Sequence, residues 1–159
     1  MSQPPDLIDF DGDWPPYEEL LYQIFLDTVV NAGLTFRGWP VRSQFRPETR
    51  GKGFSFWHVI SEAESPTNRN EDDRIPDIER CRKLRWIAWL IVNAGQPGFS
   101  WWENQRGSET RAVIWAEEHD FAVILAKRRD KYVLKTAYCL KERRRASFAR
   151  ERDEYRERP

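Results

Sequence analysis

The chain has 159 residues, which is enough for one domain with a hydrophobic core and gives no reason to expect a second. No apolar run reaches the roughly 18 residues that a membrane helix needs, and the acidic start MSQPPDLIDFDGDW lacks the basic region of a secretory signal. Cys81 and Cys139 have no second Cys or His at metal-ligand spacing, which is typical of reduced thiols. We therefore expect a cytoplasmic protein without a metal, a cofactor or a membrane contact.

The formal net charge is zero, but the 26 basic and 26 acidic groups are segregated along the chain. Residues 1–35 hold seven acids and no Lys or Arg, whereas residues 127–150 hold ten bases against two acids. Such a basic cluster is the electrostatic footprint of a surface that binds a polyanion, although a solvated helix face gives the same pattern.

The first part of the chain predicts a helix, a short pair of strands and two loops. After a flexible acidic N-terminus at residues 1–14, residues 17–32 have apolar side chains at helical spacing and end at Gly33. The segment LTFRGWPV indicates two short strands. A basic loop then precedes FSFWHVISE, which contains His58, and the polar residues 63–74 are expected to be a mobile loop. The basic loop carries Arg42, Arg46, Arg50 and Lys52.

Residues 75–93 form the best predicted helix of the chain, with a core face and Gly95 as its stop. Beside the core face, Arg82, Arg85, Trp86 and Trp89 share helical spacing. Either the tryptophans pack in the core and the arginines are solvated, or the four side chains form a basic-aromatic face that meets RNA.

The second half of the chain predicts strands, in contrast to the helices of the first half. FSWWEN, ETRAVIWAEE, FAVILAKR and KYVLKTAYCL are runs of β-branched and aromatic residues separated by turn signals, which predicts an antiparallel meander. Residues 141–159 are charged and favour an exposed helix. The expected fold is a single α+β domain, in which N-terminal helices pack on a four-stranded antiparallel sheet and a charged helix ends the chain.

The chain lacks a phosphate-binding glycine loop, a CxxC pair, HExxH and GxSxG. Metal-independent RNA cleavage needs only a base for the 2′-hydroxyl, an acid for the leaving oxygen and cations around the phosphate. His58 is a candidate acid or base, because its unperturbed pKa lies near neutrality. In the last strand, alternation places Tyr132 on one face with Thr136 and Tyr138. His119, among acids in EEHD, is expected to be a surface residue.

The order FWHVIS, RIPDIERCRKLRWI, WWENQRG and RAVIWAEEHDFAVILAKRRDKYVLKTAYCL resembles small phage- and mobile-element-associated proteins of the BECR superfamily. That superfamily joins barnase, EndoU, colicin tRNase domains and RelE-like toxins, and the resemblance covers about residues 36–155. It implies a helix-then-sheet ribonuclease fold, no metal, an RNA substrate such as a tRNA or mRNA, and a toxin held by an antitoxin or immunity protein.

The resemblance also implies site residues. His58 matches the end of the FWH motif, Trp102, Asn104 and Arg106 match a W-x-N-x-R strand, and Thr136 and Tyr138 match a TAY strand. We assign His58 as the acid or base, Arg46 and Arg82 as phosphate clamps, and Thr136 and Tyr138 as groups at the scissile phosphate. The remaining RNA contacts are expected from Arg50, Lys52, Arg85, Trp102, Asn104, Arg106 and Arg128.

Two other hypotheses remain open at this point. The same basic-aromatic surface is also that of a non-catalytic module that binds RNA or an acidic protein. Alternatively, FWH is only a corner of the core, and His58 then contributes to stability alone. Superfamily-level analogy does not choose between these hypotheses.

Overall fold

The helical half of the molecule comes first along the chain. The computed structural model describes residues 3–158. Helix α1 (Trp14–Phe25) continues into a short π-helix, η1 (Leu26–Val30), and the chain then turns at Gly33 with a φ of +66°. A residue without a Cβ adopts this conformation at low cost. The buried side chains of α1 recur at helical spacing, as the apolar pattern predicts. They are Tyr17, Leu21, Ile24 and Phe25.

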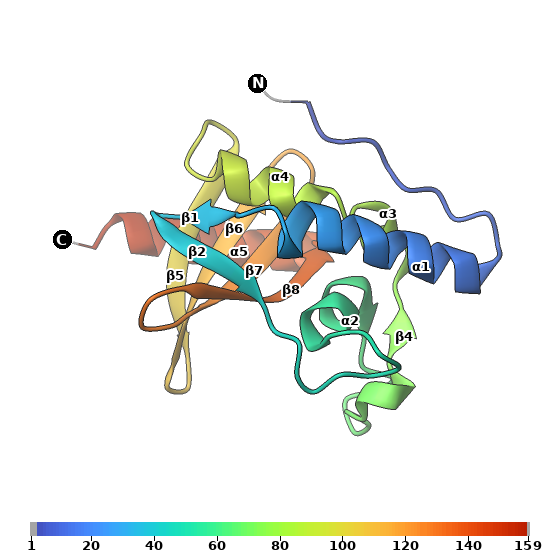
Figure 1. Ribbon diagram of the computed structural model, residues 1–159. Coiled ribbons are helices and arrows are strands. Elements are labelled where there is room, and N and C mark those ends of the chain that lie inside the picture. The colour runs from blue at the N-terminus through green and yellow to red at the C-terminus, as the bar shows by residue number, and fades with distance from the viewer. Residues whose placement is uncertain (1–2, 159) are drawn as a thin grey trace.

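The main sheet has six strands in the order β1-β2-β8-β7-β6-β5 (Figure 1). The predicted meander consists of β5 (Phe99–Arg106), β6 (Glu109–Ala116), β7 (Phe121–Lys127) and β8 (Tyr132–Cys139). The hairpin of β1 (Thr35–Phe36) and β2 (Trp39–Ser43) extends it, and β2 pairs parallel to β8. The expected four-stranded antiparallel sheet is therefore wrong. The sheet is mixed, because the hairpin satisfies the backbone groups at part of the otherwise open edge of β8.

Different helices pack on the two faces of the sheet. N-terminal helices pack on the first face and share its main core. The second face carries a smaller core, which consists of Trp102, Val113, Trp115, Ala122, Ile124, Leu140 and Phe148. Phe148 belongs to helix α5 (Glu142–Arg156), which lies on this second face (Figure 1). The charged helix expected at residues 141–159 is thus anchored through Phe148, which is 1% exposed. One buried aromatic residue gives no apolar stripe for a periodicity to detect.

The helix predicted at residues 75–93 is in fact two helices, α3 (Ile78–Arg82) and α4 (Trp86–Asn93). A turn separates them, in which the backbone N–H of Trp86 donates to the carbonyl of Lys83 at 2.8 Å. α4 is apolar on several sides and lies in the core, whereas α3 is amphipathic. The break between them allows the two helices to have different axes. Trp86 and Trp89 are each 7% exposed and contact each other at a ring-centroid distance of 5.7 Å. Of the two alternatives, core packing or an RNA-binding face, the structure supports core packing for both tryptophans.

Helix α2 (Phe54–Ile60) is followed by a loop that folds back on it. Strand β3 (Ser61–Glu62) pairs with β4 (Ile75–Pro76), and a 3-10 turn, η2 (Glu71–Asp73), lies between them. The side chain of Asn70 caps this turn by accepting a hydrogen bond from the backbone N–H of Asp72 at 3.0 Å. The chain therefore turns back on itself between residues 63 and 74, and this brings Glu71 close to α2.

The acidic N-terminal segment lies across α3 and α4 (Figure 1). The backbone N–H of Ile8 donates to the carbonyl of Arg82 at 2.9 Å, and Trp86 Nε1 donates to the carbonyl of Pro5 at 2.9 Å. Asp9 forms an ion pair with Arg82 at 3.2 Å. Part of the segment expected to be flexible at residues 1–14 is thus packed on the helices, and its first two residues lie outside the described range.

Candidate nucleic-acid interface

His58 lies at the C-terminal end of α2, with its imidazole packed on the ring of Phe54. The ring centroids are 3.9 Å apart and the planes differ by 25°. His58 Nε2 lies 2.6 Å from Oε1 of Glu71. When Nε2 carries the proton, it donates to this carboxylate, and Nδ1 keeps the lone pair that a general base needs. Phe54 and Glu71 together fix the orientation of the imidazole.

Burial lowers the pKa of His58, because the charged imidazolium loses more than the neutral ring when water is removed. The hydrogen bond and the charge of Glu71 oppose this effect and raise the pKa, whereas the nearby cations Arg74 and Lys135 lower it. The net shift is downward from the ordinary value of 6.5. The neutral imidazole, which is the form that accepts a proton, is therefore favoured over the imidazolium.

Helix α2 is fastened to the edge of β8 at the last residue that pairs with β2, Leu134, and beyond it. Ser55 Oγ donates to the carbonyl of Leu134 at 2.7 Å, and the hydroxyl of Thr136 donates to the carbonyl of His58 at 2.8 Å. Arg80 Nη1 also donates to the His58 carbonyl, at 3.4 Å. The hydroxyl proton of Thr136 is thus engaged in holding the backbone of α2.

A hollow of about 730 Å³ lies between the first turns of α5 and the end of β8. Most of its lining side chains are basic, and no Asp or Glu is among them. The lining consists of Arg80, Arg106, Tyr138, Cys139, Lys141, Arg143, Arg144, Ser147 and Arg150. We refer to this surface as the arginine hollow.

Five of the six cations in the arginine hollow have no acidic partner. Within residues 3–158, no carboxylate lies within ion-pair distance of Arg106, Lys141, Arg143, Arg144 or Arg150. The sixth cation, Arg80, pairs with Asp77 at 3.5 Å. Arg145, which lies on α5 but does not line the hollow, pairs with Asp120 at 2.7 Å. Unbalanced charge of one sign in a concave surface attracts a polyanion and raises its rate of association.

A narrow extension of about 50 Å³ adjoins the arginine hollow on the second face of the sheet. Both spaces are lined by Arg106, Tyr138 and Arg144, and the extension also reaches Asn104 and Thr136. The hydroxyl of Tyr138 accepts a hydrogen bond from Arg144 Nη2 at 3.4 Å, so its own proton is free for another acceptor. Four residues predicted from the sequence, two on β5 and two on β8, are thus brought together.

A β-bulge in β8 decides which side chains share this face. The register with β7 shifts by one residue, with Lys135 as the extra residue. Tyr132 therefore packs in the main core against Phe36, at a ring-centroid distance of 5.0 Å, while Thr136 and Tyr138 line the extension. The prediction that Tyr132 shares a face with them is wrong, because strict alternation assumes a strand without a bulge.

Lys135 lies next to the His58 cluster. Its Nζ is 5.3 Å from the ring centroid of Phe54, the ring that packs on His58. Burial lowers the pKa of Lys135, Glu109 raises it, and two nearby arginines lower it. One of these, Arg128, was predicted to contact RNA and pairs with Glu109 at 3.4 Å.

Five other predicted residues lie away from the arginine hollow. Lys52 is buried and forms ion pairs with Glu18 and Glu19, so it stabilises the contact of its loop with α1. Arg82 is paired with Asp9, and Arg85 donates to the carbonyl of Asp6 at 3.4 Å. The Arg50 guanidinium lies 4.7 Å from the Trp57 ring centroid, and Arg46 is exposed in the same loop. Acidic residues of α1 thus neutralise Lys52, and an acidic residue of the N-terminal segment neutralises Arg82. The five residues are Arg46, Arg50, Lys52, Arg82 and Arg85.

Trp102, predicted to contact RNA, is fully buried. Its ring packs on Phe148 at a centroid distance of 5.2 Å, and its Nε1 donates to Glu151 at 3.3 Å. Asn104 Nδ2 donates to the same carboxylate oxygen at 2.9 Å. The expectation for Trp102 does not hold for this structure, because α5 covers the ring and leaves no face on which a base could stack.

The sequence reasoning missed several residues of the interface. The charge run at residues 127–150 contains Lys141, Arg143, Arg144 and Arg150, but charge alone does not tell which members face a concave surface. Glu71 lies in a polar stretch and carries no local signal of a partner. Only the pairing of β3 with β4 brings it to His58.

Comparisons with protein-family models, curated proteins and solved structures found no match to this chain. Among residues 3–158, no group of three or more His, Cys, Asp or Glu side chains is placed to hold a metal ion. No helix in the same range is long and apolar enough to cross a membrane. The side chains around His58 and the arginine hollow are therefore the basis for a functional assignment.

Proposed function

We propose that this chain is a metal-independent endoribonuclease that binds RNA in the arginine hollow and cleaves it with His58 as general base. The observation that carries the proposal is the group of five unpaired cations beside the strand that holds α2. Arg80 connects the two parts, since it lines the hollow and donates to the backbone carbonyl of His58. We infer that a phosphate chain bound in the hollow continues past Arg80 toward α2.

The chemistry uses groups that the chain supplies. His58 Nδ1 takes the proton of a 2′-hydroxyl, the 2′-oxygen attacks the adjacent phosphorus, and the bond from phosphorus to the 5′-oxygen breaks. The leaving oxygen takes up a proton from an acid, for which the hydroxyl of Tyr138 is our candidate. The products are an RNA end with a 2′,3′-cyclic phosphate and one with a 5′-hydroxyl. Arg106 and Arg144, which flank Tyr138, stabilise the extra negative charge on the phosphate oxygens.

The proposal extends to a cellular role as a toxin held by an antitoxin or immunity protein. It is supported by the resemblance in the strand and helix motifs, and by the charge of the arginine hollow. An acidic partner that occupies the hollow blocks RNA through the same unpaired cations. Co-expression with such a partner is then needed for the host to tolerate the active chain.

The test is incubation of the purified chain with total bacterial RNA in EDTA, followed by mapping of new RNA ends. We expect discrete cuts that carry 2′,3′-cyclic phosphates. A His58→Ala variant loses a group that typically contributes 10²–10⁴-fold to the rate, and should leave the RNA intact while still binding it. His119→Ala is the matched control, because His119 packs against Trp86 and Trp89 and lies outside the proposed site. Equal cleavage by wild type and His58→Ala would overturn the assignment of His58.

A second candidate function is an RNA-binding module without catalysis. One observation favours it: the imidazole of His58 is engaged by Phe54 and Glu71, and the hydroxyl of Thr136 is engaged by a backbone carbonyl. These contacts are also what a structural role requires. Intact RNA after incubation with the folded wild-type chain, together with salt-dependent RNA binding, would select this second function.

A further inference from the structure

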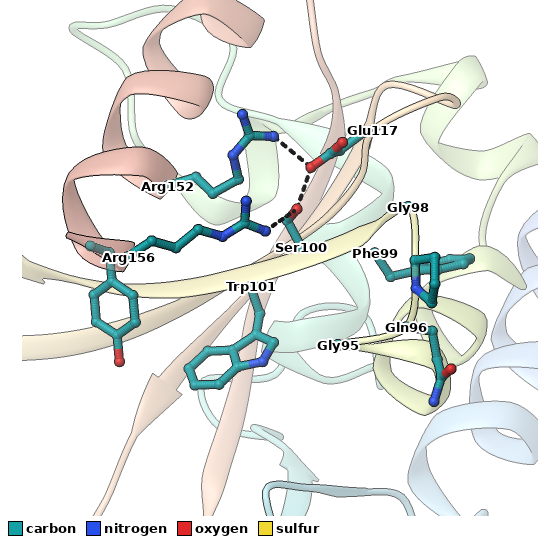
Figure 2. Close-up of a pocket in the computed structure, with 11 residues that line it drawn as sticks. Gly95, Gln96, Gly98, Phe99, Ser100, Trp101, Glu117, Arg152 and Arg156 are labelled. Carbon is teal, nitrogen blue, oxygen red and sulfur yellow. Dashed lines mark hydrogen bonds and ion pairs between the residues drawn. The ribbon is translucent and has the colours of Figure 1, made fainter. Parts of the chain in front are cut away.

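A second cavity, of about 840 Å³, lies at the other end of α5 (Figure 2). It is formed by the loop before β5, the first residues of β5, Glu117 after β6, and the last turns of α5. Its volume is within the range of about 300–1,000 Å³ that small-molecule sites occupy. It shares no lining residue with the arginine hollow. We call it the C-terminal pocket.

One wall of the C-terminal pocket is a chain of polar contacts (Figure 2). Arg152 Nη1 donates to Oε1 of Glu117 at 2.5 Å, and the Ser100 hydroxyl donates to the same oxygen. Arg156 Nη2 donates to Ser100 Oγ at 3.2 Å. Glu117 is thus neutralised by Arg152. Arg152 is shared by two carboxylates, since its Nε also lies 3.0 Å from Oδ1 of Asp153. Among the residues that the structure describes, Arg156 has no carboxylate within ion-pair distance, so its guanidinium is the cation of this wall that is open to an anion.

The pocket also offers aromatic surface. The rings of Trp101 and Tyr155 lie with their centroids 6.0 Å apart, and both side chains are only partly buried. Gly95 lies beside the indole, since a Cβ at this position would be in ordinary van der Waals contact with Trp101 Nε1, at 3.7 Å. Gly95 and Gly98 adopt φ values of +90° and +87°, which L side chains rarely adopt. The loop therefore approaches the aromatic pair without bulky side chains at its two glycines.

These two walls define the chemistry of a ligand. The guanidinium of Arg156 is held only by a neutral hydroxyl and has further N–H donors, in a planar fork that matches phosphate oxygens. The Arg37 guanidinium lies 4.5 Å from the Trp101 ring centroid, and that of Arg158 lies 5.5 Å from the Tyr155 ring centroid. A planar ring would therefore stack on the face of each ring that its arginine leaves open. Ser100 and Trp101 project from opposite sides of β5 (Figure 2), so the ligand that suits both walls is one whose phosphate and planar ring are joined around the strand.

We propose that the C-terminal pocket is a binding site for a nucleoside monophosphate unit, with its phosphate at Arg156 and its base against Trp101 and Tyr155. This site is separate from the arginine hollow and does not depend on the proposed cleavage of RNA. The same chemistry is present in a free mononucleotide and in the 5′-phosphorylated end of an RNA. The test therefore includes both sources.

The experiment is isothermal titration calorimetry of the full chain with AMP, adenosine, inorganic phosphate and a short oligoribonucleotide with or without a 5′-phosphate. We expect AMP to bind at least about tenfold more tightly than adenosine or phosphate alone, because each of these lacks one of the two contacts. Tighter binding of the 5′-phosphorylated oligonucleotide than of its unphosphorylated counterpart, with the difference lost in Arg156→Gln, assigns the site to RNA ends. AMP binding without such a difference assigns it to free nucleotides.

Variants locate the binding. Arg156→Gln should weaken AMP binding about tenfold or more, since it removes a charge-assisted contact to phosphate. The matched control is Arg150→Gln, which removes an arginine of the same helix that lines the arginine hollow. Tyr155→Leu should weaken AMP binding while phosphate binding stays the same, and circular dichroism checks that each variant is folded. The proposal is overturned if AMP does not bind, if inorganic phosphate binds as tightly as AMP, or if Arg150→Gln has the larger effect.

Discussion

The arginine hollow makes a quantitative prediction about the salt dependence of RNA binding. Its five unpaired cations are exposed or half-buried and face a common space. Replacing Arg106 and Arg143, one on β5 and one on α5, by Gln removes two charges without removing a buried side chain or an ion pair within residues 3–158. The double variant should therefore fold like the wild type and bind RNA less tightly.

The magnitude follows from counterion release. Each phosphate of a single strand that a cation neutralises contributes about −0.7 to the slope of log K against log salt concentration. Five such contacts give a slope of about −3.5, so raising the salt from about 50 to about 200 mM weakens binding roughly 100-fold. Removing two contacts should make the slope shallower by about 1.4, to about −2.

Fluorescence anisotropy of a labelled single-stranded RNA at four salt concentrations measures this slope. The matched control is Arg82→Gln with Arg85→Gln, which removes the same charge from α3 and the turn that follows it. We expect no change of slope in this control, because Arg82 is already paired with Asp9 and Arg85 is held by the N-terminal segment. An unchanged slope in the Arg106 and Arg143 variant, or an equal change in the control, would refute the assignment of RNA binding to the arginine hollow.

Three further predictions concern stability. The pKa of His58 is lower in the folded state than in the unfolded chain. As the pH falls below about 6.5, the unfolded state therefore takes up the proton first. The free energy of unfolding should then decrease with falling pH until the pKa of the folded state is passed. His58→Gln should remove this component from urea denaturation curves measured between pH 8 and 5, whereas His119→Gln should retain it. Phe148→Ala should cost about 3–5 kcal/mol and release α5 from the second face, and near-ultraviolet circular dichroism should then show altered packing around Trp102 and Trp115. A cost below about 1 kcal/mol would mean that α5 is not anchored there. Thr136→Val should cost about 1 kcal/mol in the same denaturation assay, because the His58 carbonyl loses its shorter hydrogen bond, and no loss of stability would show that α2 does not depend on this contact.

The local pattern of the sequence was sufficient for much of the meander. β5, β6, β7 and β8 lie where runs of β-branched and aromatic residues are separated by turn signals, since strand preference and turn chemistry are local properties. Local pattern also identified His58, Thr136 and Tyr138 as chemically suitable side chains. It did not give the pairing of β2 with β8, because parallel pairing across some ninety residues leaves no trace in local periodicity.

The sequence by itself determined that residues 127–150 form a basic run and that a histidine is preceded by aromatic residues. Only the tertiary structure decided which of these groups act together. Glu71 reaches His58 because β3 and β4 pair, and the bulge at Lys135 turns Tyr132 away from Tyr138. The burial of Phe148 leaves one side of α5 facing a hollow in which five of the six cations have no acidic partner among residues 3–158. These arrangements depend on contacts between distant segments, which the character of each segment does not specify.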